Sequence, residues 1–471
     1  MRSNARLIIA ALFLSEVAVV FESAMLYTAL PTLIRQFGDP ISAGWLITIH
    51  ILIGAAVSVV IGRLGDIFGR KPMILAVLAI ATAGSVLSAV TTHFGIVLVG
   101  RAMQGFAVAA IPLTIGVIRE SLPVKRVPVA VGLMTTATAM GGAIGLVLGG
   151  VIVDRFNWHW LFVLSAILLG ISWLAVRVCL PSRAGTPPTA PVNWIEGVLL
   201  VPGIMALLYG FSLSKKLGWS SPQLLGWITL GVLVLAWWAR ISLRAREPFV
   251  DLRLLGTRNV AIANGLAALL SLGTMQVMLV YAPYIQSPRW TLVGLGLSAT
   301  AAGLSKLPSN VLSLLSGPLA GYLSARMGTR PIVLAGVLLT AIGWFASMGL
   351  PASLGEVILL LCVITIGSSM LNAAIYLVMV EVVPPHRTGE AIGMMSVFRG
   401  ISTAIGAQLV VILLASDTLN APGGAQLPSA SGYQLAMGWI GGVTLLGVGL
   451  TLLLRPPVKP PQPTGATSPA G

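Results

Sequence analysis

Residues 62–75 read GRLGDIFGRKPMIL, and residues 321–334 repeat the pattern as GYLSARMGTRPIVL. Gly, Leu, Gly, Pro and the final Leu coincide at an offset of 259 positions. A second pair agrees at an offset of 261, where residues 120–145 share nine of 26 positions with residues 381–406. Because the two offsets nearly match, we interpret the chain as a duplication of one unit.

The chain that carries these repeats is much more apolar than a soluble protein. Of its 471 residues, 56% are hydrophobic and 9% are charged, whereas soluble globular proteins are about 25% charged. Apolar stretches near the roughly 20-residue length that spans a bilayer recur from end to end. The composition therefore predicts an all-α membrane protein and excludes a soluble multidomain one. Fourteen transmembrane spans are predicted, near residues 7–31, 43–62, 73–92, 95–118, 128–152, 160–180, 194–213, 223–241, 259–284, 294–325, 331–350, 355–380, 389–415 and 434–454.

The distribution of basic residues predicts the orientation of these spans. An even number of spans places both termini on one side of the membrane. If that side is cytoplasmic, twenty Lys and Arg lie in cytoplasmic segments and five lie outside, as the positive-inside rule requires. The net charge of +15 is therefore attributed to topology and not to nucleic-acid binding. We expect a multi-pass protein of the cell membrane whose first apolar run is retained as a span.

The repeats divide the chain into two halves of six spans each. The predicted halves are residues 1–183 and 247–455, and residues 184–246 hold a Pro-rich linker with two inserted spans. The tail at 456–471 is rich in Pro, Thr and Ser and is predicted to be disordered. Parallel six-span repeats are a transporter architecture in which the substrate site lies between the halves, near the midplane of the membrane.

The loop at residues 62–71 interrupts two apolar spans with glycines and charges. Its glycines allow a short turn and a close approach of the backbone, and Asp66 and Arg70 can bridge neighbouring helix ends. The segment resembles the loop motif of the major facilitator superfamily. The matching positions are Gly62, Leu64, Asp66, Gly69, Arg70 and Lys71.

The resemblance implies a charge relay that locks one conformation and is released in the other. Asp66 and Arg70 are then gate residues, with Arg119 and Glu120 as their neighbours. The second copy has Ala325 where the first has Asp66, so a weaker gate is expected in the C-terminal half. The alternative is a loop that only sets the membrane topology.

Two further segments resemble motifs of the same superfamily. Residues 98–110 resemble its span-four motif, with Arg101 and Gln104, and an arginine inside the membrane usually faces protein or a water-filled cavity. The alternative for Arg101 is a packing charge with a structural partner. The fifth span has the glycine pattern of the drug/proton antiporters, except that Leu146 replaces their proline; tight helix packing alone is the other interpretation. These glycines are Gly132, Gly141, Gly145, Gly149 and Gly150.

The first span carries the most specific resemblance. Residues 21–33 (FESAMLYTALPTL) are similar to the span-one signature of the fourteen-span drug/proton antiporters, and Glu22 stands at that signature's Asp position. The linker at 247–255 also resembles that subfamily. The resemblance covers nearly the whole chain and implies the major facilitator fold with two inserted central helices.

Carboxyl groups inside the predicted spans are few, and they are the candidates for proton coupling. A carboxyl in a low-dielectric interior can exchange a proton near neutral pH. Glu22 is the first choice as proton carrier, and Arg101 is expected to tune it. Glu16 lies six residues earlier, so it points about 120° away and is either a second acid of the cavity or a helix contact. Glu196 lies near the start of the seventh span.

The C-terminal half carries Lys306 and Arg399 within its spans but no mid-membrane acid. Arg399 holds the fold in one interpretation. Lys306 either snorkels or pairs internally, or it meets a carboxylate of span one or an anionic substrate group. Members of the resembling family that export organic dications tend to have acids in this half, so the resemblance argues against a transporter specialised for dications. The candidates for lining the substrate cavity, with ordinary packing or a helix contact as the alternative, are Tyr27, His50, Gln104, Met275, Gln276, Tyr281, Tyr284, Lys306 and Arg399.

These observations predict a proton-coupled exporter of small amphipathic organic compounds or drugs, working by alternating access. No nucleotide-binding loop, catalytic cluster or metal spacing is present, and Cys179 and Cys362 stand alone. We therefore expect no enzyme activity, no cofactor, the proton gradient as energy source, and a monomer that binds lipid, protons and a small substrate but no nucleic acid. The alternatives are a transporter of an anionic metabolite on the same fold and a membrane sensor that has lost transport.

Overall fold

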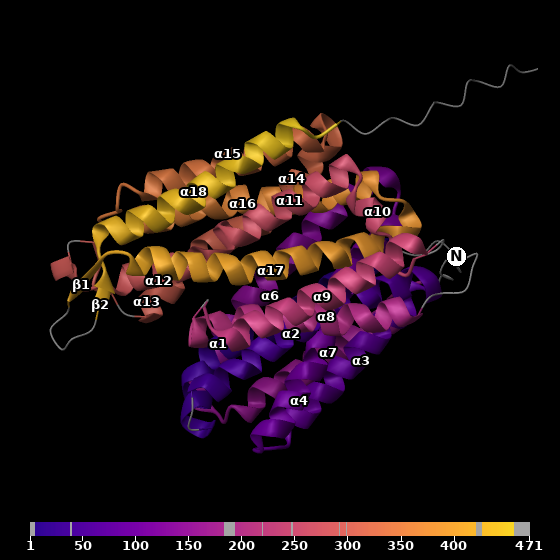
Figure 1. The fold of residues 1–471 in the computed structure, drawn as a ribbon, viewed down its shortest axis with the longest axis horizontal. Helices are drawn as coiled ribbons and strands as arrows, with labels where there is room; N and C mark the ends of the chain where they lie inside the picture. Colours follow the sequence, from indigo (N-terminus) through magenta and orange to yellow (C-terminus); the bar gives the residue numbers. More distant parts are fainter. Residues whose placement is uncertain are drawn as a thin grey trace, which may run out of the picture.

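The protein is a bundle of long helices that run side by side along one direction (Figure 1). The computed structural model describes residues 5–37, 40–182, 194–218, 220–245, 248–291, 293–297, 299–420 and 426–455. The predicted tail at 456–471 and most of the linker before the inserted helices lie outside the described residues.

The N-terminal half contributes seven α-helices and two short 3-10 segments. They are α1 (Ala5–Phe37), α2 (Pro40–Phe68), α3 (Arg70–Ala89), α4 (Phe94–Gly105), η1 (Phe106–Ala109), α5 (Ala110–Ser121), η2 (Val124–Arg126), α6 (Val127–Arg155) and α7 (His159–Cys179).

The remainder of the chain contains two central helices, the C-terminal half and one β-hairpin, whose antiparallel strands pair Thr418 with Pro428. The central helices are α8 (Trp194–Leu217) and α9 (Pro222–Arg244). The C-terminal half comprises α10 (Leu252–Leu255), α11 (Arg258–Leu272), η3 (Thr274–Gln276), α12 (Val277–Gln286), η4 (Arg289–Thr291), α13 (Ala299–Leu304), α14 (Leu307–Met327), α15 (Thr329–Ser347), α16 (Leu354–Val382), η5 (Pro385–Arg387), α17 (Thr388–Ala415), β1 (Thr418–Asn420), β2 (Gln426–Pro428) and α18 (Ala430–Leu452).

Within the described residues, twelve helical segments are long and apolar enough to cross a membrane. They include every predicted span except those of α8 and α14. Both of these are nevertheless helices, of 24 and 21 residues. The fold is thus an all-helical membrane fold.

Two predicted spans are interrupted. The span expected at 294–325 begins only at Ala299 and divides at Ser305 into α13 and α14, where Pro308 in the first turn of α14 suits a new helix start. The span expected at 259–284 breaks at Gly273 between α11 and η3, where the backbone has φ −101° and ψ −84°. These breaks lie beside the cavity described below.

The internal repeat is visible in the backbone. Gly69 ends α2 with φ 100°, and Gly328, 259 positions later, ends α14 with φ 85°. Positive φ favours glycine because a Cβ atom is strained there, so each copy needs its glycine at this turn. The short segments η2 and η5, which precede α6 and α17, are likewise related by the offset of 261.

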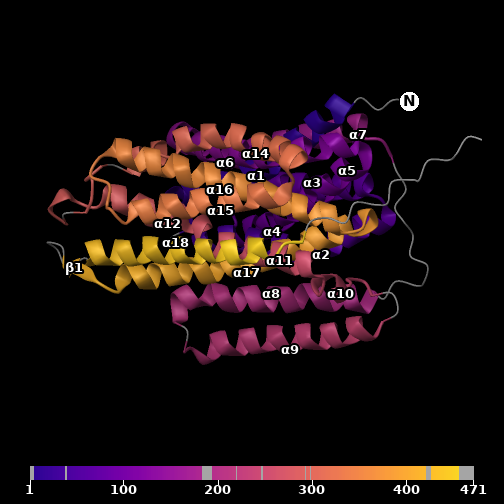
Figure 2. The ribbon, with the colours of Figure 1, turned by 90° about the horizontal axis from the view of Figure 1, so that it is seen from above.

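The two halves contact each other through α2 with α17 and α6 with α14. A Cβ atom added to Gly62 would lie 2.4 Å from the Gly389 carbonyl oxygen, and one on Gly132 would lie 2.3 Å from that of Gly317. Both crossings therefore require glycine at the point of contact. Figure 2 shows α8 between α9 and the rest of the bundle, and α8 packs against both α2 and α17.

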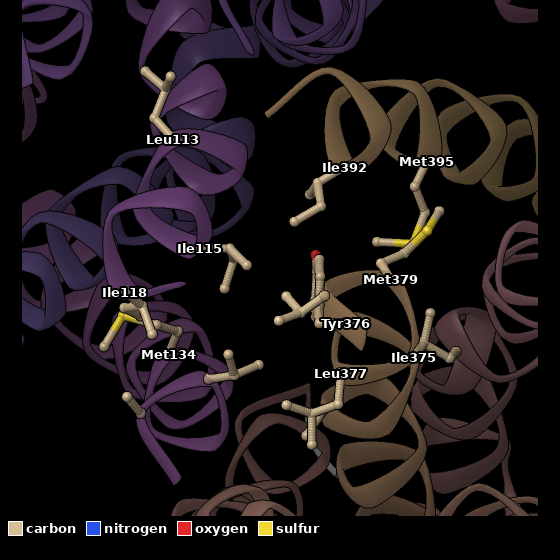
Figure 3. Packing of buried hydrophobic residues seen from close by; sticks show 14 of the residues in the cluster. Leu113, Ile115, Ile118, Met134, Ile375, Tyr376, Leu377, Met379, Ile392 and Met395 are labelled. Atoms are coloured by element: carbon tan, nitrogen blue, oxygen red, sulfur yellow. The ribbon is translucent and has the colours of Figure 1, made fainter. Parts of the chain in front are cut away.

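An apolar cluster fills the interface between the halves near these crossings. Leu113, Ile115 and Met134 from α5 and α6 face Leu377 and Ile392 from α16 and α17 (Figure 3). Apolar side chains of the two halves thus pack against one another at this end of the interface.

Candidate functional site

Asp66, at the end of α2, joins the two halves. Its carboxylate accepts hydrogen bonds from the backbone N–H groups of Gly389 at 3.4 Å and Glu390 at 3.1 Å, in the first turn of α17. A helix N-terminus has unsatisfied N–H donors and a positive dipole end, so a carboxylate there is stabilised. Asp66 is 4% exposed, and it therefore acts where solvent screening is weak.

Arg70 and Arg119 extend this contact. Arg70 lies 2.6 Å from Asp66 and 2.5 Å from Glu120, and it donates to the Pro385 carbonyl oxygen of the other half at 2.7 Å. Arg119 donates to the Thr388 hydroxyl at 2.8 Å and to the Val383 carbonyl. We call Asp66, Arg70, Arg119 and Glu120 the gate, after the role that the resemblance of the loop motif implies for them. The structure brings together these four residues that the loop motif singled out.

Lys71 does not bridge the halves. Its ammonium donates to the carbonyl oxygens of Arg177 at 2.8 Å and Leu180 at 2.5 Å, at the end of α7. A cation at a helix C-terminus satisfies carbonyl groups that have no partner within the helix. Lys71 therefore ties α3 to α7 within the N-terminal half, while Gly69 provides the turn and Gly62 the close contact with α17.

The second repeat has a different set of side chains at the corresponding positions. At the positions of Arg70 and Glu120 it has Thr329 and Glu381, and the Thr329 hydroxyl donates to the Glu381 carboxylate. Ala325 replaces Asp66. A hydrogen bond from a hydroxyl therefore stands where the first repeat has an ion pair between Arg70 and Glu120, and the weaker gate expected in this half stays a prediction.

Four further charged residues lie beside the gate, and none of them was predicted as a site residue from the sequence. Glu390 is 1% exposed and lies 3.6 Å from Arg63 and 3.7 Å from Arg387, and Arg387 lies 3.1 Å from Asp251. An acid at the otherwise apolar start of a span was the available signal for Glu390. Its ion pairs form between segments far apart in the sequence, so spacing could not reveal them.

The segment Phe249–Asp251 connects the inserted helices to this cluster, and we call it the strap. The Phe249 N–H donates to Glu196 of α8 at 2.9 Å, and the Val250 carbonyl accepts from Ser242 of α9 at 2.7 Å. The Asp251 N–H donates to Glu390 at 2.5 Å. Glu196 is thus a backbone acceptor, and the inserted helices are tied to the gate.

A cavity of about 700 Å³ lies between the halves. Residues of α1 and α6 form one wall, and residues of η3, α12, α13, α14 and α17 form the other. Four of the residues predicted from the sequence as cavity candidates line it: Tyr27, Met275, Gln276 and Lys306. The volume and the mixture of apolar wall with a few polar groups are those of a small-molecule site. We call it the main cavity.

Other residues expected in the cavity have partners elsewhere. His50 lies 2.8 Å from the Ser23 hydroxyl, and Gln104 donates to Ser85 at 2.7 Å. The hydroxyl of Tyr281 lies 2.5 Å from that of Ser347, and Tyr284 donates to the Pro351 carbonyl at 2.9 Å. None of the four lines the main cavity as described. In the structure they hold helices together.

Glu16 and Arg399 face a smaller cavity of about 230 Å³, which we call the inner cavity. Glu16 accepts a hydrogen bond from Thr138 at 3.3 Å, and its other carboxyl oxygen accepts none from a described residue. Arg399 donates to the Tyr376 hydroxyl at 3.0 Å and to Asn372. Met275 lines both cavities, so the two are neighbours.

Glu22 and Arg101 are enclosed within the N-terminal half, both at 0% exposure. Arg101 Nη1 lies 3.9 Å from the Glu22 carboxylate, and the guanidinium donates to Gln104 at 2.7 Å and to the Leu46 carbonyl at 3.0 Å. Neither carboxyl oxygen of Glu22 accepts a hydrogen bond from a described residue. Glu22 faces α4 and Glu16 faces α6, as their predicted angular separation implies.

The glycine motif packs α6 against two partners. A Cβ atom on Gly141, Gly145 or Gly149 would lie 2.5 to 2.7 Å from the nearest atom of α1. Gly132 contacts α14, whereas nothing lies within 4 Å of such an atom on Gly150. Four of the five glycines therefore permit close helix contacts.

Comparison with known proteins agrees with this architecture. The family model described as Major Facilitator Superfamily matches residues 12–407 and, in a second match, residues 265–470. The chain is 26% identical to the Multidrug resistance protein B homolog of Mycobacterium tuberculosis over 81% of its own length and 71% of that protein. It is 27% identical to the Cephamycin export protein CmcT of Amycolatopsis lactamdurans over 88% and 85%. The crystal structure of the human organic anion transporter MFSD10 aligns with a TM-score of 0.68 at 15% identity, covering 95% of this chain and 99% of that one, which concerns the fold alone.

Proposed function

The chain belongs to the Major Facilitator Superfamily, and we propose that it is an exporter of small amphipathic organic compounds driven by the proton gradient. The observation that carries the proposal is a small-molecule cavity between two halves that are joined at one end by a charged gate. The names of two relatives, a multidrug resistance protein homolog and a cephamycin export protein, support export as the direction.

The finer assignment is the fourteen-span drug/proton antiporter subfamily. In this assignment α8 and α14 also cross the membrane, in addition to the twelve segments that are long and apolar enough to do so. The glycine contacts between α6 and α1 support it. Fourteen spans and the bias of basic residues also support cytoplasmic termini in the cell membrane.

In the proposed cycle, the gate closes the cytoplasmic end while the main cavity is accessible from the other side. Opening the gate breaks the bonds of Asp66 to α17 and of Arg70 and Arg119 to the Pro385 and Val383 carbonyls. These groups can exchange their partners for water at a membrane surface, so the gate is reversible. The protein works as a monomer without a bound cofactor in this proposal.

Glu22 is the proposed proton carrier, with Arg101 as its partner and Glu16 as a second acid on the inner cavity. A buried carboxylate that lies 3.9 Å from its cation and accepts no hydrogen bond from a described residue is poorly stabilised, because desolvation is offset only by a long ion pair. Uptake of a proton removes that charge and frees Arg101, which changes the packing of α1 against α4.

The test is export from proteoliposomes with and without a pH gradient, using a fluorescent lipophilic dye. We expect wild-type export to stop when a protonophore collapses the gradient. Glu22→Gln should show, with and without the gradient, the same rate of dye movement as the wild type without it. Glu356→Gln is the matched control, since Glu356 lies on the surface in the first turn of α16. Equal wild-type export with and without the gradient would refute proton coupling.

A further inference from the structure

Lys306 places a cation in the wall of the main cavity. It lies between α13 and α14, and its ammonium donates to the Thr365 hydroxyl at 2.7 Å. An ammonium has three donors, so this contact leaves two. Among the described residues, no carboxylate lies within 4 Å of this group as an ion-pair partner.

The surroundings reinforce the positive charge. Lys306 is the only ionised side chain among the described residues that line the main cavity. The N-terminus of α14, a 21-residue helix, begins at the next residue, and Leu307 and Asn310 of its first turn also line the cavity. The positive end of the helix dipole therefore adds to the field of the ammonium.

The two buried acids of α1 have other surroundings. Glu22 is enclosed beside Arg101, and Glu16 faces the inner cavity with Thr138 and Arg399. Glu16 precedes Tyr27, which lines the main cavity, by eleven residues of α1, or about 16 Å of helix. A cation away from bulk water is costly without a counter-charge, and no described residue supplies one as an ion-pair partner of Lys306.

We infer that the cavity binds an amphipathic organic anion, with its acidic group on the Lys306 ammonium and its apolar body against Met275, Leu279 and Leu146. This rests on the proposed function, since it assigns a substrate class to the proposed transport cavity. The apolar wall provides hydrophobic contact, and the single cation selects an acid such as a carboxylate or sulfonate over an amine. The positive charge of Lys306 both attracts the acidic group and repels cations.

The experiment measures binding of three probes with one fluorescent body and different ends. They are N-dansyl-6-aminohexanoate, the neutral N-dansylhexylamine and the cationic dansylcadaverine. The purified full-length protein in lipid nanodiscs is titrated with each, without any proton gradient. We expect the wild type to bind the carboxylate at least tenfold more tightly than the neutral probe, and the cation most weakly.

Variants of Lys306 separate charge from structure. Lys306→Gln is expected to weaken carboxylate binding about tenfold and leave the neutral probe unchanged, whereas Lys306→Arg keeps the preference. Lys125→Gln, which removes a surface lysine of η2, is the control and should preserve the wild-type order. The probe order of the wild type is informative even if a Lys306 variant fails to fold.

Three outcomes would overturn the inference: no carboxylate preference in the wild type, a preference for the cation, or equal weakening of all probes in folded Lys306→Gln. Proton-driven dye export with any of these results would leave the proposed function intact and remove only the substrate class. Conversely, a carboxylate preference in a protein whose export ignores the pH gradient would retain the site and refute the coupling.

Discussion

Replacing Asp66 by Asn is expected to shift the equilibrium of the gate toward the open state. The Asp66 carboxylate contacts Arg70 at 2.6 Å and accepts from the Glu390 N–H of the other half at 3.1 Å, with its side chain fully buried. Hydrogen bonds to charged groups contribute about 1.5–3 kcal/mol each. Asn keeps one oxygen acceptor but no charge, so we expect a loss of about 2 kcal/mol, or about 30-fold in the ratio of closed to open protein.

The assay is a distance measurement by electron paramagnetic resonance between spin labels on Val124→Cys and Met327→Cys. These exposed residues lie at the gate end of opposite halves, and Cys179 and Cys362 are first replaced by Ser. Opening of the gate lengthens the distance between the labels. We expect the fraction of the longer distance to rise in the Asp66→Asn protein.

Lys71→Gln is the matched control, because Lys71 belongs to the same loop but contacts only carbonyl groups of its own half. Its distance distribution should equal that of the wild type. If Asp66→Asn left the distribution unchanged, or if Lys71→Gln shifted it equally, the contacts across the halves would not control the gate.

Two further predictions concern the packing around the gate. Gly132→Ala brings a methyl group against the Gly317 carbonyl at 2.3 Å and should destabilise the protein by about 1–3 kcal/mol. Gly150→Ala, where the added methyl group meets open space, is the control and should leave the thermal unfolding temperature within error of the wild type. Equal shifts of the unfolding temperature in the two variants would contradict the close crossing. Glu196→Leu removes the acceptor of the Phe249 N–H. The Phe249 amide should then lose about 1–3 kcal/mol of protection against hydrogen exchange. Unchanged protection would show that the strap does not depend on α8.

The strap gives the inserted helices a physical connection to the gate. α8 packs on α2 and α17, the two helices whose ends form the cross-half contact. Asp251 and Glu390 join the strap to Arg387 at the start of α17. Movement of α17 against α2 therefore also acts on the strap and on the helices to which it is bonded.

Much of the fold could be predicted from the sequence, because hydropathy and internal repeats can be recognised in the order of the residues without knowledge of how the helices pack. Apolar runs of membrane-spanning length indicated the helices, and the offsets of 259 and 261 related Gly69 to Gly328 and η2 to η5. The break at Gly273 was missed, since residues 258–286 remain apolar enough to form one span. The break at Ser305 was also missed, although Lys306 and Pro308 beside it were a signal in the sequence.

The candidate site was only partly predictable. The loop motif indicated Asp66 and Arg70, and the rarity of charge inside spans indicated Glu22, Arg101 and Lys306. Only the tertiary structure decided which of these meet. It placed Glu22 against Arg101 and away from both cavities, and it placed Lys306 on the main cavity, whose described lining residues include no acid.

The sequence by itself thus determined the membrane-embedded helices, their duplication and the residue types that carry charge. The tertiary structure alone decided that Asp66 caps α17 and that Glu390 binds the strap. The physical reason is that these contacts join residues 139 to 324 positions apart. Their geometry depends on how the helices cross, which glycine contacts such as Gly62 on Gly389 permit but no local pattern specifies.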